Sequence, residues 1–86
     1  MSSHPTNFEG SVVDALKEAI QKEIPDAVVE AAGSGGHFTL RVVSSVFEGK
    51  NMLASQRLVY GAIAHLMKGE RAPVHAIDSL KTATPS

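Results

Sequence analysis

The stretch that decides the fold spans residues 37–67 and reads HFTLRVVSSVFEGKNMLASQRLVYGAIAHLM. In its first part Phe38, Leu40 and Val42 occupy every second position, which is typical of a strand with one buried face. After a glycine-containing junction, apolar residues recur at helical spacing, which predicts a helix that begins after Asn51. The stretch therefore predicts a strand that leads through a short turn into an amphipathic helix.

This helix carries signals at both of its ends. Asn51 is a residue type that caps helix N-termini, and Gly69 suits the C-terminal end. Arg57, His65 and Lys68 are expected to lie away from the sheet. The side expected to pack on the sheet is formed by Met52, Val59, Ala62, Ile63 and Leu66.

Another helix is predicted in the segment SVVDALKEAIQKEI, residues 11–24. Ser11, with Asp14 three residues later, forms a capping-box arrangement that places the helix start at Ser11. The helix is expected to end before Pro25, because the residue before a proline disfavours the α region. The apolar residues near one face are Val12, Leu16, Ala19 and Ile20.

Two further strands complete the pattern. The segment AVVEAAG (residues 27–33) and the strand of residues 37–44 flank the loop GSGG, which predicts an antiparallel hairpin. The segment VHAIDSL (residues 74–80) predicts a last strand, parallel to the second because a helix links the two. The expected fold is a small α+β domain of order α-β-β-α-β, with a three-stranded mixed sheet and both helices on one face.

The chain has 86 residues, enough for one small domain. We expect a flexible N-terminal tail over residues 1–9, a domain over residues 10–82 and a C-terminal tail over residues 83–86. The N-terminus lacks the basic and apolar regions of a signal peptide, and no apolar run reaches the roughly 18–20 residues that span a bilayer. A cytoplasmic protein without membrane contact is therefore expected.

Charge and cysteine content limit the function classes. The net charge is -1, with eight basic and nine acidic residues, so the chain has no overall attraction to nucleic acid. Because there is no cysteine, the chain can offer neither a disulfide nor a thiolate ligand.

Histidines are the strongest candidates for metal chemistry. His37 and His75 each begin a predicted strand, whereas His4 lies in the expected tail and His65 on the helix surface. A closed zinc site needs roughly four ligands, so this chain cannot build one from two histidines. From the residues alone, plain strand-end histidines remain the alternative.

Two basic residues stand near the start of the second helix. Lys50 and Arg57 are candidates for contacts with nucleic-acid phosphates, and a solvated charged surface is the alternative. The loop GSGG matches the GxxG pattern of KH domains, but there that loop joins helices, whereas here it joins predicted strands.

The sequence resembles the BolA family. The resemblance rests on His37-Phe38, the block VVSSVFEGK, RLVY at residues 57–60, and VHA followed by SLKTATP. It implies a KH-like (type II) α+β fold, in agreement with the predicted order of elements. The chain departs from the usual pattern in that the spacing between His75-Ala76 and the final Thr-Pro is one residue longer.

The resemblance also implies a function. The resemblance implies that this protein pairs with a monothiol glutaredoxin. It further implies a non-enzymatic role in iron–sulfur cluster assembly, trafficking or iron regulation. In such a heterodimer a two-iron two-sulfur cluster is shared with a glutaredoxin cysteine and glutathione. His75 matches the family's ligand position before alanine, and His37 matches the second ligand position near the hairpin. The isolated protein, as a monomer, is expected to hold no cluster.

A different role is also attributed to the family, namely that of a DNA-binding transcriptional regulator. It would use the KH-like fold and the second helix, with Lys50 and Arg57 as the contacting residues. The net charge of -1 speaks against this alternative, because phosphate contacts require clustered basic residues.

Overall fold

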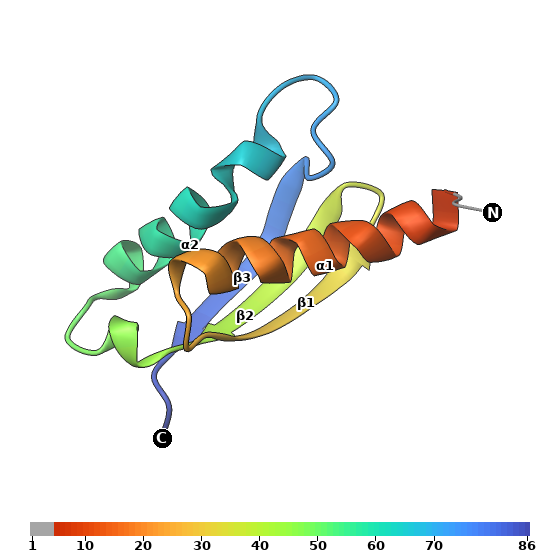
Figure 1. The fold of residues 1–86 in the computed structure, drawn as a ribbon. Coiled ribbons are helices and arrows are strands. Elements are labelled where there is room, and N and C mark those ends of the chain that lie inside the picture. Colours follow the sequence, from red (N-terminus) through yellow and green to blue (C-terminus); the bar gives the residue numbers. More distant parts are fainter. Residues whose placement is uncertain (1–4) are drawn as a thin grey trace.

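The helices and strands follow the predicted order in the computed structural model, which describes residues 5–86 (Figure 1). The elements are α1 (Pro5–Glu23), β1 (Val28–Ser34), β2 (His37–Val43), a short 3₁₀ helix η1 (Ser45–Phe47), α2 (Met52–Met67) and β3 (Ala76–Ala83). Within residues 5–86, no helix combines the length and the apolar content needed to cross a membrane.

The start of α1 differs from the prediction. The helix begins at Pro5, so Ser11 lies inside it and is not its cap. Proline is favoured at the first helical position, where its missing N–H would have no helical partner. Residues 5–9, which were expected in the flexible tail, therefore belong to α1, while residues 1–4 lie outside the described part of the chain.

The first two strands form the predicted antiparallel hairpin. Their register runs from the pair Val28 and Val43 to the pair Ser34 and His37. The turn is shorter than GSGG, since only Gly35 and Gly36 lie between the strands. Both have positive φ angles, 64° and 84°, which suits a tight turn between twisted strands and favours glycine.

The third strand lies parallel to β2, as predicted, and completes a sheet of order β1-β2-β3. It spans Ala76–Ala83, so it begins two residues after the predicted start at Val74 and includes Ala83 from the expected C-terminal tail. The register shifts between Phe38 and Thr39. This β-bulge leaves Asp78 without a partner on β2, and the longer spacing seen in the sequence is accommodated in this strand.

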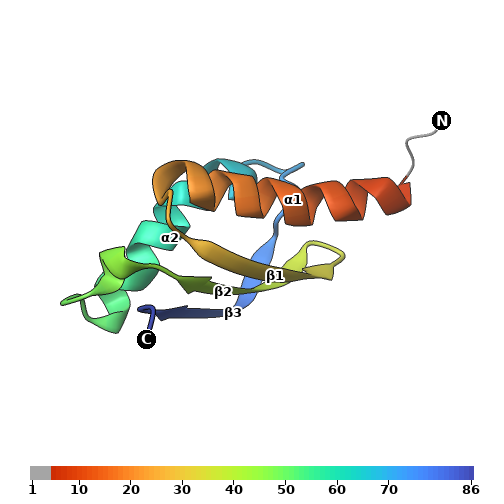
Figure 2. The ribbon, with the colours of Figure 1, turned by 60° about the horizontal axis from the view of Figure 1, so that its bottom comes forward.

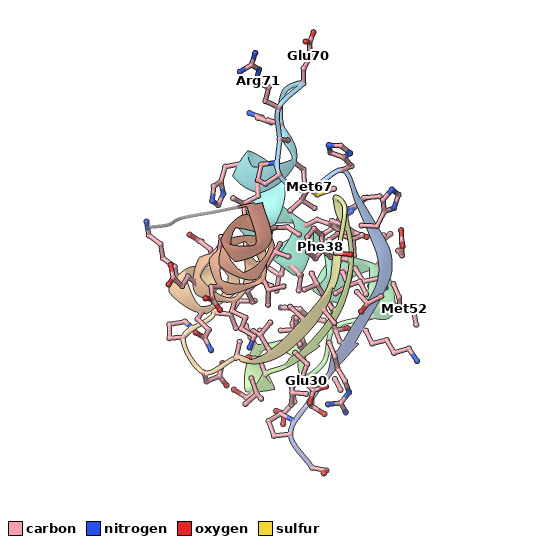
Figure 3. All side chains as sticks on the ribbon, turned by 90° about the vertical axis from the view of Figure 1, so that its right-hand side faces the viewer. Glu30, Phe38, Met52, Met67, Glu70 and Arg71 are labelled. Carbon is pink, nitrogen blue, oxygen red and sulfur yellow. The ribbon has the colours of Figure 1, made fainter. Side chains whose placement is uncertain are left out.

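The buried face of β2 forms the centre of the core. Phe38, Leu40 and Val42 are buried together with Val59 and Ile63 of α2. Figure 2 shows α1 and α2 on the same side of the sheet, and in Figure 3 Phe38 lies between the sheet and the helices. The predicted arrangement of a sheet covered by helices on one face is therefore confirmed.

One residue of the predicted apolar side of α2 lies elsewhere. Met52 is 71% exposed, at the periphery of the molecule (Figure 3). It is the first residue of α2, and the apolar residues of this helix that join the core begin only at Val59. The predicted cap is confirmed, because the Asn51 side chain accepts a hydrogen bond of 2.8 Å from the amide of Ala54.

The junction between β2 and η1 is tied to the turn after α1. The hydroxyl of the buried Ser44 donates to Asp26 Oδ1 at 2.5 Å, and the hydroxyl and amide of Ser45 donate to Asp26 Oδ2 at 2.8 and 3.1 Å. The Ser44 hydroxyl also accepts from the amide of Val46 at 3.1 Å. These bonds lower the pKa of Asp26 below its ordinary value, and the bond from Ser44 has the largest effect.

Candidate functional site

The two histidines predicted to bind a metal lie at the same end of the sheet. His37 is the first residue of β2 and pairs with Ala76, the first residue of β3. His75 directly precedes that strand. Although His37 and His75 are 38 positions apart (75 − 37), the parallel pairing of β2 and β3 brings their backbones to adjacent strands.

The hairpin turn holds His75 in place. The carbonyl oxygen of Gly36 accepts hydrogen bonds from the amides of His75 and Ala76, at 2.8 and 3.0 Å. The imidazole of His75 also packs against Gly36, since a Cβ there would lie 2.9 Å from the ring atoms Cγ and Nδ1. Gly36 is therefore needed for its positive φ and for the space that the His75 ring occupies.

The ring of His37 contacts a carboxylate on β3. Its Nδ1 lies 3.1 Å from Asp78 Oδ1, and both side chains are more than half exposed. Since an ionised carboxylate can only accept hydrogen bonds, this contact suits the tautomer of His37 that has its proton on Nδ1. In that tautomer Nε2 is the ring nitrogen that can act as a ligand.

The donor set is suited to part of a metal site. Among the side chains that the structure describes, those of residues 12–86, no group of three or more histidine, cysteine, aspartate or glutamate residues is placed to hold a metal ion. What the chain offers is the imidazoles of His37 and His75, a ligand type that iron–sulfur centres accept in place of thiolate. These residues fit a cluster only if another molecule supplies the thiolates.

The candidate nucleic-acid residues lie apart from the histidines. Lys50 precedes α2 and Arg57 lies in its first half, and both are exposed. The helix runs back along β3, because the Gln56 side chain bonds to the carbonyl of Leu80, whereas the carbonyl of Leu66 bonds to the amide of Val74. The start of α2 is therefore at the opposite end of β3 from His75 (Figure 1).

His65 has a different environment from His37 and His75. It is exposed, as predicted, and lines an open groove of about 490 Å³ between α1 and α2 together with Glu18 and Glu23. The loop that follows α2 projects from the body of the protein, with Glu70 and Arg71 at its tip (Figure 3).

Two residues that shape the site were not found from the sequence. Asp78 contacts His37 across the pairing of β2 and β3, and no pattern in VHAIDSL indicates the register of that pairing. Gly36 was identified as part of a loop, but its contact with His75 depends on the pairing of β2 and β3.

Comparison with known proteins shows the family. Residues 7–86 match the model of the family described as "BolA-like protein". The human protein "BolA-like protein 1" is 36% identical over 84 residues, which cover 91% of this chain and 58% of the human protein. The chain therefore spans little more than half the length of that relative.

Solved structures agree with this match. A BolA protein homologue from Coxiella burnetii has a TM-score of 0.70 and 37% identity, covering 84% of this chain and 88% of that one. The BolA domain of SufE1 from Arabidopsis thaliana has a TM-score of 0.74 and 27% identity, with coverages of 88% and 94%. The family match along nearly the whole described chain, together with the shared fold, shows that this protein belongs to the BolA family.

Proposed function

We propose that this protein is a non-enzymatic partner of a monothiol glutaredoxin and supplies His75 and His37 as ligands to a shared two-iron two-sulfur cluster. The observation that carries the proposal is the placement of His37 at the start of β2 and of His75 just before the adjacent β3, beside the hairpin turn, in a chain without cysteine. Its role would be in the assembly or trafficking of such clusters or in iron regulation.

The chemistry of the donor atoms supports this division of labour. A cluster requires thiolates, and here they would come from the glutaredoxin cysteine and from glutathione. Imidazole ligands raise the reduction potential of a cluster relative to thiolate ligands, as in Rieske centres. The chain's own contribution is to hold two imidazoles: the carbonyl of Gly36 positions the backbone of His75, and the ring of His75 lies against the same residue.

The exposure of the site supports a partner. His37 is more than half exposed, and His75 is also exposed, so both rings are accessible to another protein.

The test is to mix the protein with a glutaredoxin that carries a cluster and to record visible absorption and circular dichroism. The expected result is a new spectrum at a ratio of one protein to one glutaredoxin, and no cluster on the protein alone. A spectrum equal to the sum of the separate components would contradict the proposal.

The alternative function is that of a DNA-binding regulator. It is favoured by the exposure of Lys50 and Arg57 near the start of α2. Two basic side chains neutralise few phosphates, and the net charge of -1 gives no further attraction. The cluster partnership is therefore the function that the site supports better.

A further inference from the structure

The bulge in β3 changes which side chains face the open side of the sheet. Ile77 and Leu80 both pack against the core although they are three residues apart, whereas side chains in a regular strand alternate between faces. The bulge accounts for this spacing, since Phe38 pairs with Ile77 and Thr39 already pairs with Ser79. Asp78, between them, has no partner on β2.

Asp78 lies next to His37 on the open face of the sheet. The alternation of β2 puts His37 on the face opposite to the buried Phe38. Asp78 is exposed, and its Oδ1 lies 3.1 Å from His37 Nδ1. The contact joins the first residue of β2 to a residue that the bulge has displaced from the regular pairing.

We propose that Asp78 is a positioning residue for His37, which fixes the ring as the Nδ1–H tautomer and leaves Nε2 as the ligand atom. This inference rests on the proposed cluster partnership. Histidines that bind metals commonly donate their other ring N–H to a carboxylate, which sets both the tautomer and the orientation of the ring. In an unrestrained imidazole Nε2 usually carries the proton, and that tautomer presents no lone pair at Nε2.

The contact serves orientation more than stability. Exposed pairs of this type contribute little to the free energy of folding, because water screens the interaction. Replacing Asp78 is therefore expected to leave the fold unchanged and to alter the tautomer and the ligand strength of His37. This expectation separates a positioning role from a structural one.

The first experiment uses the protein without any cluster. Long-range proton–nitrogen correlation spectra of the nitrogen-15-labelled protein at neutral pH report which ring nitrogen of His37 carries the proton. The wild-type protein should show the Nδ1–H tautomer, and Asp78→Ala should show mostly Nε2–H. Ser79→Ala, a change at the next residue, should leave the His37 signals as in the wild type. A wild-type His37 in the Nε2–H form, or an Asp78→Ala spectrum equal to that of the wild type, would overturn the proposal.

The second experiment uses the mixed complex with a cluster-loaded monothiol glutaredoxin. Removal of a carboxylate that supports a ligand typically weakens metal binding by about 10–100-fold. Asp78→Ala should therefore lose the cluster to a chelator about 10-fold faster than the wild type, and Ser79→Ala should lose it at the wild-type rate. Equal rates for wild type and Asp78→Ala would overturn the positioning role while leaving the cluster partnership intact. If the wild-type protein forms no mixed complex, the partnership fails, and with it the link between Asp78 and ligand binding.

Discussion

The imidazole of His75 rests against Gly36, so closely that a Cβ at this glycine would lie 2.9 Å from two of the ring atoms. The carbonyl of the same glycine accepts the His75 amide at 2.8 Å. Gly36 also directly precedes His37, so the same turn residue adjoins both histidines. The hairpin turn is thus part of the site although it supplies no ligand.

Replacement of Gly36 should therefore disrupt the site without removing a ligand. Gly36→Ala adds a Cβ in the space of the His75 ring, and it should weaken the mixed-cluster circular dichroism signal. Gly35→Ala is the matched control, since Gly35 also has a positive φ but a Cβ there would meet nothing within 4 Å. Each change should cost about 1–2 kcal/mol for the left-handed backbone. Equal cluster signals for the two variants would contradict the role of Gly36.

The core prediction concerns Leu40. It is 3% exposed in the centre of the buried cluster, so Leu40→Ala should lower the free energy of unfolding by about 2–5 kcal/mol in denaturant melts. Thr39→Ala, at the exposed neighbour on the same strand, should change it much less. A loss below about 0.5 kcal/mol for Leu40→Ala would show that this strand face does not form the core.

The bonds around Asp26 predict an acid-dependent loss of stability. Hydrogen bonds from Ser44 and Ser45 lower the pKa of Asp26 in the folded protein below its ordinary value of 3.8. This stabilisation is present above the pKa of the unfolded chain and is lost as the pH falls through the folded-state pKa. Asp26→Asn should accordingly be less stable than the wild type at neutral pH and should approach it in acid.

The measurement is a series of urea unfolding midpoints between about pH 7 and pH 2, a range that brackets ordinary carboxyl pKa values. Asp14→Asn, at an exposed position of α1, is the control and should follow the wild-type curve more closely. A constant difference between Asp26→Asn and wild type over the whole range would rule out the proposed contribution of the ionised carboxylate.

Binding to DNA is expected to be weak, sensitive to salt and largely independent of sequence. The double variant Lys50→Ala, Arg57→Ala should reduce the slope of log affinity against log salt by about 2, one for each lost phosphate contact. Fluorescence anisotropy with a labelled duplex measures this. Tight binding to one duplex sequence at physiological salt, in the presence of excess competitor DNA, would instead favour the alternative function of a DNA-binding regulator.

The sequence was most informative where a strong period coincided with tertiary burial. The alternation of Phe38, Leu40 and Val42 and the helical spacing of Val59 and Ile63 both describe surfaces that became core. These two patterns predicted the order of the elements. Because a helix links the last two strands, they also predicted the parallel pairing that the structure shows. The family resemblance was then carried by the junction between these elements.

What could not be predicted depends on contacts between distant segments or on the ends of elements. The helical spacing extended to Met52, but spacing alone does not reveal where a helix leaves the core. Ser11 had a capping-box pattern, yet Pro5 can start a helix equally well, and the chain continued the helix from there. The contact of Asp78 with His37 depends on the register between β2 and β3, which leaves no periodic signal in the sequence.

The measurement that tests the central claim most directly is the visible circular dichroism of a cluster-loaded monothiol glutaredoxin mixed with wild-type protein, His75→Ala or His65→Ala. His65 is an exposed histidine on α2 and serves as the matched control. The account predicts a new mixed spectrum with the wild type and with His65→Ala, and the unchanged glutaredoxin spectrum with His75→Ala, whose fold should survive because its side chain is exposed. A wild-type mixed spectrum with His75→Ala would contradict the assignment of His75 as a cluster ligand.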